Sequence, residues 1–265
     1  MRPVAALGAA TAILLVVGCA GAPKTVVTTP SEGFLADGAI ARLAEAVPPP
    51  PAVGSIQDLA DKAASARYVA LEDSDRWLLA TSHAELRPPL ALQHFDCALG
   101  VRLGSAETPA LDRLMARVFH DANSVAERVK ARQARPRPVG DDPRRRACQV
   151  VNAATRQGAS YPSGSAAVGV AYGEAFAALE PDRAEAVRRI SHQIGVSRLI
   201  CAMHYPTDVA VGEEIGRAVV VEVVQTPAFK ADVAAARAEL EAARRSGLTN
   251  PGCAAERAAL ATVLP

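Results

Sequence analysis

Residues 197–208 bring a cation, an imidazole and a carboxylate together within an otherwise apolar part of the chain. Residues three or four apart share a face of a helix, so Asp208 is expected to lie one turn beyond His204 and to hold one of its ring nitrogens. Pro206 disfavours helix at the residue before it and should bend the chain between the two. With Arg198 in reach of the same pocket, the pattern predicts an anion site that contains a nucleophile or base. The alternative is a capped helix end with a surface histidine.

Two further motifs precede this segment. Lys130 begins the pattern K-x6-R-P, which ends in Arg137 and Pro138, and a Pro-Ser-Gly sequence ends at Gly164. A phosphomonoester dianion needs fixed cations and hydrogen-bond donors around its non-bridging oxygens. Lysine and arginine provide the charge, and a helix that opens at Gly164 would add free backbone N–H groups. Together the three motifs predict a phosphate site.

In their order and spacing, the motifs K-x6-R-P, P-S-G and S-R-x5-H-x3-D resemble the signature of the type 2 phosphatidic acid phosphatase superfamily. The surrounding sequence is most similar to the bacterial class A non-specific acid phosphatases of that superfamily, from about residue 47 to about residue 243. This resemblance implies an all-α, single-domain helical bundle. It also implies an acid phosphatase that hydrolyses small phosphomonoesters without a metal or other cofactor, at a site that accepts phosphate or vanadate.

The resemblance assigns a role to each matching residue. His204 would attack phosphorus in line and form a phosphohistidine intermediate, which water would then hydrolyse. Asp208 would hold His204 in the reactive tautomer and stabilise its charge. The expected phosphate-binding residues are Lys130, Arg137, Ser163, Gly164 and Arg198.

One position departs from the family pattern. The family has a histidine after Pro-Ser-Gly, where it is proposed to protonate the departing alkoxide, and this chain has Ser165. A serine hydroxyl is far less acidic, so we expect a loss of ~10²–10⁴-fold on substrates with basic leaving groups and a smaller loss on aryl phosphates. His192 is an alternative proton donor. The other histidines, His83, His94 and His120, have no motif support.

Two other functions stay open. A non-catalytic phosphate-binding relative would keep the cations and lose turnover at Ser165. A vanadate-dependent haloperoxidase shares the same anion cage, although that group also has histidine at this position. A membrane-embedded lipid phosphatase is disfavoured because no stretch after residue 19 is apolar and long enough to span a bilayer.

The N-terminal residues are typical of export. Residues 1–19 combine Arg2 with an apolar run that ends in Val-Val-Gly-Cys, which looks like a lipoprotein box with Cys19 as the acylated residue. Ordinary signal cleavage after Ala22 is the alternative. We expect a periplasmic protein that is lipid-anchored to the bacterial outer membrane through Cys19 and has no other membrane contact.

Composition divides the remaining chain into three parts. Residues 20–46 are rich in small and polar residues and predict a flexible linker, residues 47–250 the phosphatase domain, and residues 251–265 a C-terminal tail. A net charge of +1 argues against nucleic-acid binding. The apolar stretch at 209–224 predicts a helix that could support a homo-oligomer.

Helical periodicity supplies the elements that must position the motifs. Ser55 should cap a helix with Ile56, Leu59 and Ala63 along one face. Apolar side chains recur at helical spacing over residues 108–130 and place Lys130 at the end of that helix. The helix that Gly164 opens is rich in alanine and glycine, so neighbouring helices can approach it closely, and we expect it to be central.

Four cysteines besides Cys19 form an even set in an oxidising compartment, which predicts two disulfides. They are Cys97, Cys148, Cys201 and Cys253. Three pairings are possible, the sequence does not choose among them, and buried free thiols are the alternative. No CxxC or CxxH spacing suggests a metal site. A disulfide at Cys201 would pin the active-site segment.

Overall fold

α-Helices and short 3-10 turns make up the regular structure of residues 32–265, the part of the chain that the computed structural model describes, and these residues contain no β-strand. The predicted all-α fold is therefore confirmed. The predicted signal peptide, with the predicted lipidation residue Cys19, and the first part of the predicted linker lie outside the described residues. The helices are α1 (Asp37–Glu45), α2 (Ile56–Arg67), α3 (Asp75–Ser82), α4 (Asp96–Leu99), α5 (Pro109–Lys130), α6 (Pro138–Asp141), α7 (Ala153–Gln157), α8 (Gly164–Leu179), α9 (Ala184–Ile200), α10 (Pro206–Val223), α11 (Pro227–Arg245) and α12 (Cys253–Leu260).

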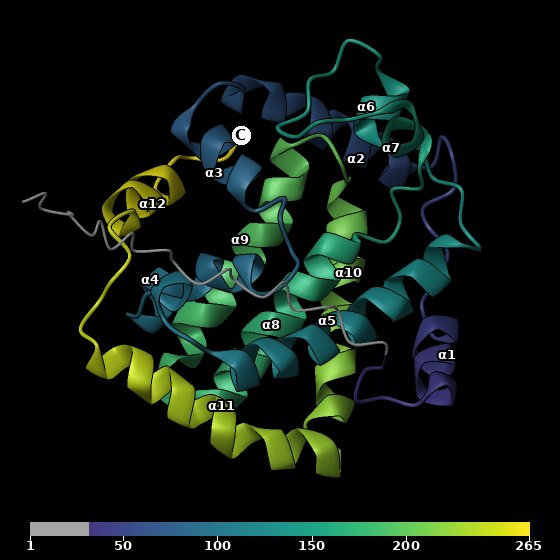
Figure 1. The fold of residues 1–265 in the computed structure, drawn as a ribbon. Helices are drawn as coiled ribbons and strands as arrows, with labels where there is room; N and C mark the ends of the chain where they lie inside the picture. The colour runs from purple at the N-terminus through teal and green to yellow at the C-terminus, as the bar shows by residue number, and fades with distance from the viewer. Residues whose placement is uncertain (1–31) are drawn as a thin grey trace, which may run out of the picture.

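Helix α8 is the centre of the bundle, as its small residues predict. It is buried on nearly all sides and packs against α5, α9 and α10 (Figure 1). Glycines let the neighbours come close: a Cβ atom at Gly216 of α10 would lie 2.4 Å from the carbonyl oxygen of Ala167, and one at Gly173 would lie 2.6 Å from the Ser191 side chain on α9. These close approaches bring the ends of α5, α8, α9 and α10 together.

Helix α5 keeps the predicted apolar stripe. Leu111, Leu114, Met115, Val118 and Val125 are all fully buried. Their spacing of three or four residues places them on one face. The helix ends at Lys130, so its last turn carries the first residue of the phosphate motifs to the end of the bundle where α8 begins.

The predicted apolar face of α2 is not the buried one. Ser55 caps the helix as expected and accepts a hydrogen bond from the Asp58 backbone N–H at 3.2 Å. However, Ile56 and Leu59 are 89% and 58% exposed, while the side chains of Asp58 and Asp61 are buried. The reason is that α2 packs over a buried arginine, so its inward face carries carboxylates rather than aliphatic groups.

Parts of the predicted linker and tail are folded. Residues 37–45 form α1, which packs on α5 with Ile40 and Ala44 buried, so the linker prediction for 20–46 is wrong there. A spacing of four residues puts these two apolar side chains on one helical face, and burying them stabilises the helix. In the tail, α12 packs on α3 and is joined to the rest of the domain by the Cys97–Cys253 disulfide.

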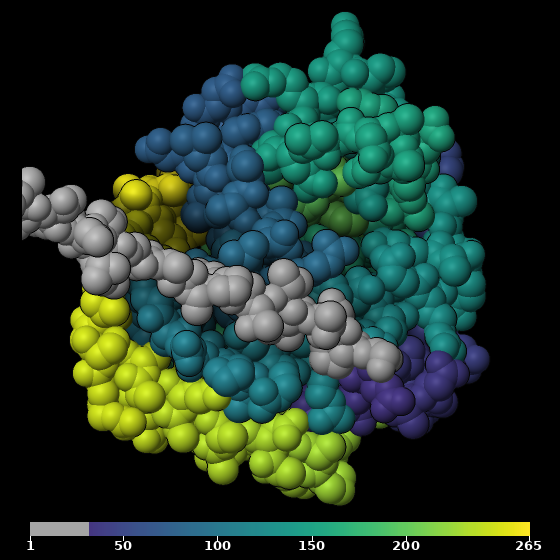
Figure 2. Space-filling view, viewed as in Figure 1, coloured from purple at the N-terminus to yellow at the C-terminus, as the bar shows by residue number. Residues whose placement is uncertain are grey.

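The second disulfide, Cys148–Cys201, ties the long connection between α6 and α8 to the end of α9. The prediction of two disulfides is confirmed, including one in the 197–208 segment. Figure 2 shows a hollow between the blue segments near α3 and the teal connection that follows α6, with green residues at its floor. Among residues 32–265, no helix has the length and apolar character needed to cross a membrane.

Candidate active site

The three sequence motifs meet at one end of the bundle. They lie at the end of α5, in the segment before α6, at the start of α8, and across the α9–α10 junction. The Ser163 backbone N–H donates to the Asp208 carbonyl oxygen at 2.9 Å, which joins α8 to α10. A Cβ atom at Gly164 would lie 3.2 Å from the Lys130 Nζ, so α5 and α8 also meet here. Segments far apart in the chain therefore form one site.

His204 is buried and neutral. Its Nδ1 lies 2.7 Å from the Ser160 carbonyl oxygen, which can only accept, so Nδ1 carries the proton and donates it. Burial, reinforced by the positive charges of Arg137, Arg198 and Lys130, holds the pKa of His204 well below its usual range. The proton-free nitrogen is consequently Nε2, which lies 3.4 Å from Arg137 Nη1. This is the tautomer that a nucleophilic Nε2 requires.

Asp208 does not hold His204 directly, which corrects the expectation from its spacing. Its Oδ2 lies 4.0 Å from His204 Nδ1 and instead accepts hydrogen bonds from the Tyr205 backbone N–H at 2.8 Å and from the Ser160 hydroxyl. The physical cause is Pro206. Because α10 begins at Pro206 and Tyr205 is extended, His204 lies outside the helix and does not share a face with Asp208.

Arg198 is the most constrained of the site's cations. It is 3% exposed, and its Nη2 donates to Gln149 Oε1 at 2.7 Å. Its Nε and Nη1 are buried without an acceptor in the described part of the chain. Burial and the neighbouring Arg137 lower the pKa of Arg198 to about 10. Two nitrogens of this guanidinium, with three N–H groups between them, are thus available for an anion.

Arg137 and Lys130 complete the set of cations. Arg137 donates from Nη1 to the Met203 carbonyl oxygen at 3.0 Å, and its buried Nε has no acceptor among residues 32–265. Lys130 Nζ donates to Glu127 at 2.8 Å. Burial lowers the pKa of both side chains. Cations held near one another without full compensation favour an anion of high charge.

At the start of α8, Ser163 is an N-cap whose hydroxyl oxygen accepts a hydrogen bond from the Ala166 N–H at 3.2 Å. The hydroxyl hydrogen is left for another acceptor. Gly164 and Ser165 follow as the first two residues of the helix, where backbone N–H groups and the helix dipole favour an anion. The Ser165 side chain is half-buried and makes no hydrogen bond within residues 32–265.

None of the other histidines forms a hydrogen bond with the site's cations or with His204 in the described residues. His192 pairs with Glu213 at 2.7 Å on an exposed side of α9, and this hydrogen bond raises its pKa. His83 is buried, and its Nδ1 lies 2.9 Å from Ser197 Oγ. His94 contacts the Glu85 carbonyl, and His120 contacts Asp121.

Sequence reasoning missed three residues that shape the site: Ser160, Gln149 and Arg135. Ser160 supplies the carbonyl that holds His204, Gln149 accepts from Arg198, and Arg135 forms an ion pair with Asp208 at 2.7 Å. Only Arg135 had a signal in the sequence, because it stands two residues before Arg137 and an extended segment would turn both side chains the same way. Gln149 is held at Arg198 by its neighbour Cys148, which is bonded to Cys201.

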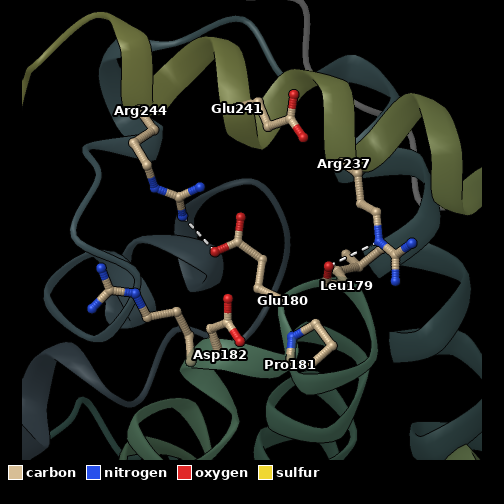
Figure 3. A pocket seen from close by; sticks show the side chains of 8 residues that line it. Leu179, Glu180, Pro181, Asp182, Arg237, Glu241 and Arg244 are labelled. Atoms are coloured by element: carbon tan, nitrogen blue, oxygen red, sulfur yellow. Dashed lines mark hydrogen bonds and ion pairs between the residues drawn. The ribbon is translucent and has the colours of Figure 1, made fainter.

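A separate pocket of about 440 Å³ lies between the C-terminal end of α8 and α11 (Figure 3). It contains none of the motif residues. Its charged groups are mostly satisfied within the protein: Arg244 pairs with Glu180, and Arg237 Nε donates to the Leu179 carbonyl oxygen at 2.9 Å. Arg183, which also lines the pocket, forms no ion pair within the described residues but is exposed, so none of the pocket's arginines is buried as Arg198 is.

Comparison with curated proteins finds acid phosphatases. An acid phosphatase of Zymomonas mobilis is 30% identical over 201 residues, which cover 76% of this chain and 76% of the relative. The chain belongs to the acid phosphatase family. Non-specific acid phosphatases of Providencia stuartii and Salmonella typhimurium are 27% identical over 245 residues and 28% identical over 199 residues, covering 96% and 78% of those relatives. No protein-family model matches the chain.

Proposed function

We propose that this protein hydrolyses phosphomonoesters through a phosphohistidine formed on Nε2 of His204, as a member of the type 2 phosphatidic acid phosphatase superfamily. The observation that carries the proposal is the protonation state of the His204 ring, with the proton on Nδ1 and the lone pair on Nε2. Its Nδ1 proton is committed to the Ser160 carbonyl, so the lone pair of Nε2 is available on the side of Arg137. Membership of the acid phosphatase family supports the same chemistry.

The phosphate would be bound by the groups that surround His204. Its oxygens would accept from the unpaired N–H groups of Arg137 and Arg198, from Lys130, and from the backbone N–H groups at Gly164. These three side chains bring three positive charges, so we propose that no metal is needed to stabilise the transition state.

The reaction has two steps. In the first, the Nε2 lone pair forms a bond to phosphorus as the bond to the leaving oxygen breaks, and the leaving oxygen takes a proton. In the second, water attacks phosphorus, the P–N bond breaks, and phosphate leaves with the imidazole restored. Trapping the intermediate tests this. Rapid quenching with labelled substrate should give a base-stable phosphoenzyme, and His204→Ala should give none.

Proton supply to the leaving group is the weak step, because Ser165 stands where the resembled enzymes have histidine. We propose that turnover of alkyl phosphates is impaired while that of aryl phosphates is largely kept, since aryl leaving groups need little protonation. The test compares p-nitrophenyl phosphate with an alkyl phosphate for the chain without residues 1–19, at about pH 5.5, where an ordinary histidine is protonated. Ser165→His should raise alkyl phosphate turnover by ~10²–10⁴-fold and aryl turnover much less.

The control is His192→Ala. Because His192 is engaged with Glu213 and forms no hydrogen bond with His204 or the site's cations in the described residues, its loss should leave turnover unchanged. A large fall in alkyl phosphate turnover in this variant would identify His192 as the proton donor instead. If neither the natural chain nor Ser165→His turns over while phosphate still binds, the protein is a phosphate-binding relative without catalytic activity. We further propose that it acts outside the cytoplasm, on small phosphomonoesters.

A further inference from the structure

A buried arginine at one of the unspecified positions of the K-x6-R-P motif pairs with the carboxylate that follows His204 by four residues. Arg135 is 6% exposed and contacts three carboxylates: Asp208 at 2.7 Å, Asp61 at 2.8 Å and Asp58 at 3.2 Å. Its guanidinium carbon also lies 4.4 Å from the centre of the Tyr205 ring. One side chain thus joins α2 to the start of α10.

Arg135 is linked to Ser160, the residue that holds His204, both by a backbone hydrogen bond and through Asp208. The Arg135 carbonyl oxygen accepts from the Ser160 backbone N–H at 2.8 Å. On the other side, Asp208 accepts from the Ser160 hydroxyl and from the Tyr205 N–H. The Ser160 carbonyl accepts the hydrogen bond from His204 Nδ1. Its position is therefore fixed by Arg135 and by Asp208, the carboxylate with which Arg135 pairs. A shift of Ser160 would turn the imidazole.

We infer that Arg135 is a positioning residue for His204, acting through Asp208 and Ser160 to keep Nε2 directed at the bound phosphate. The inference rests on the proposed role of His204 as the nucleophile. It assigns Asp208 an indirect role as well, because Asp208 orders the backbone on both sides of the imidazole without contacting the ring. In-line attack requires the nucleophile in a narrow range of positions, and a displacement of about 1 Å can cost about 100-fold in rate.

Arg135 also stabilises the charged form of Asp208. Asp208 is fully buried, and burial raises its pKa, while Arg135 and the hydrogen bonds from Ser160 and Tyr205 oppose that rise. The other titratable or charged groups around it are His204 and Arg137 on the phosphate side, Tyr161 and Tyr205, and, across Arg135, the carboxylates Asp58 and Asp61. Of the cations, only Arg135 forms an ion pair with Asp208 within residues 32–265.

Removing the Arg135 charge should shift the pH dependence of kcat in one direction. The carboxylate form of Asp208 accepts hydrogen bonds from the Ser160 hydroxyl and the Tyr205 N–H. Protonation of Asp208 weakens both hydrogen bonds. A variant without the Arg135 charge raises the pKa of Asp208 further, so protonation and the loss of His204 alignment begin at a higher pH. The acid limb of the kcat profile moves upward, toward neutral pH. Substrate binding should change little, since Lys130, Arg137 and Arg198 are untouched.

The experiment compares the natural chain with Arg135→Gln and Arg135→Lys on p-nitrophenyl phosphate, measuring kcat and KM across pH. Thermal unfolding with and without inorganic phosphate checks folding and phosphate binding. Arg113→Gln, which removes an equal charge from an exposed position on α5, is the matched control. For Arg135→Gln we expect kcat to fall by about 100-fold with KM and phosphate stabilisation nearly unchanged, and the acid limb to move upward. Arg135→Lys should restore the acid limb but only part of kcat, because one ammonium cannot reproduce the guanidinium contacts.

The outcomes separate this inference from the proposed function. If the natural chain does not turn over p-nitrophenyl phosphate, the proposed function is contradicted. If the natural chain is active and Arg135→Gln has the same kcat and the same pH profile, the role of Arg135 is contradicted. A rise in the KM of Arg135→Gln at constant kcat would contradict it as well. Since loss of Arg135 leaves the buried carboxylates of Asp61 and Asp208 without a cation and Asp58 with Lys62 alone, Arg135→Gln can fail to fold. Arg135→Lys keeps a cation among them and then decides the question: kcat equal to that of the natural chain overturns the inference.

Discussion

Replacing Arg198 with methionine should make the phosphate-free protein more stable while removing its activity. Arg198 is held in a buried site beside Arg137, and its Nε and Nη1 donate to no atom in the described residues. Such a side chain costs folding free energy and is useful only when an anion is bound. Methionine has a similar length and fills the space without a charge.

The size of the effect follows from the pKa of Arg198, which burial and the neighbouring Arg137 lower from the ordinary arginine value to about 10. At about 1.4 kcal/mol per pKa unit, the buried charge costs about 3 kcal/mol. Because the lowered pKa belongs to a base, this cost is fully present below pH 10 and disappears only as the pH rises from there toward the ordinary pKa of an unfolded arginine. Losing the Gln149 hydrogen bond costs about 1 kcal/mol, which leaves a net gain of about 2 kcal/mol. For a domain of this size, Tm should rise by about 4–8 °C.

The same change should lower kcat/KM by at least ~10²-fold, because removing one preorganised donor to a transition-state oxyanion costs that much. Thermal unfolding with and without inorganic phosphate and the turnover of p-nitrophenyl phosphate are measured together. Arg189→Met is the control: Arg189 is exposed and pairs only with Glu185 one turn away, so Tm should change by less than about 2 °C. A lower Tm for Arg198→Met without phosphate, or undiminished stabilisation by phosphate, would refute the reasoning.

Two further changes test how the bundle supports the site. Replacing both cysteines of the Cys148–Cys201 bond with serine should cost about 2–4 kcal/mol and lower kcat/KM, because the bond ties Gln149 to the end of α9; turnover equal to that of the natural chain would contradict this. Gly216→Ala should cost about 1–3 kcal/mol, since its Cβ would lie 2.4 Å from the Ala167 carbonyl oxygen, whereas Gly38→Ala meets nothing within 4 Å and should not destabilise. Equal shifts in Tm for the two glycine variants would argue against the close α8–α10 packing.

Local features of the chain were sufficient to predict the elements that carry the motifs. The apolar stripe of α5 follows a helical periodicity within one segment of 22 residues. This periodicity correctly predicted that Lys130 lies at the end of the helix. The small residues after Gly164 likewise predicted a central helix, because side-chain size limits how closely helices approach whatever else the fold does. The spacing of the three motifs also selected Lys130, Arg137 and Arg198, which the fold brings to one end of the bundle.

Contacts between distant segments were beyond the reach of the sequence. The spacing of His204 and Asp208 suggested a direct contact only on the assumption of a continuous helix, which Pro206 interrupts. The true partner of His204 is a backbone carbonyl 44 residues away, and a carbonyl carries no signature of residue type.

The face of α2 illustrates the same limit. Its aliphatic and acidic stripes are both regular, and the sequence by itself determined that the helix has two distinct faces. Which face is buried was decided only by the tertiary structure, through what lies opposite: Arg135 draws Asp58 and Asp61 inward and leaves Ile56 exposed. Periodicity is a property of one segment, whereas charge pairing, disulfide pairing and the orientation of the His204 ring are properties of two or more segments brought together by folding.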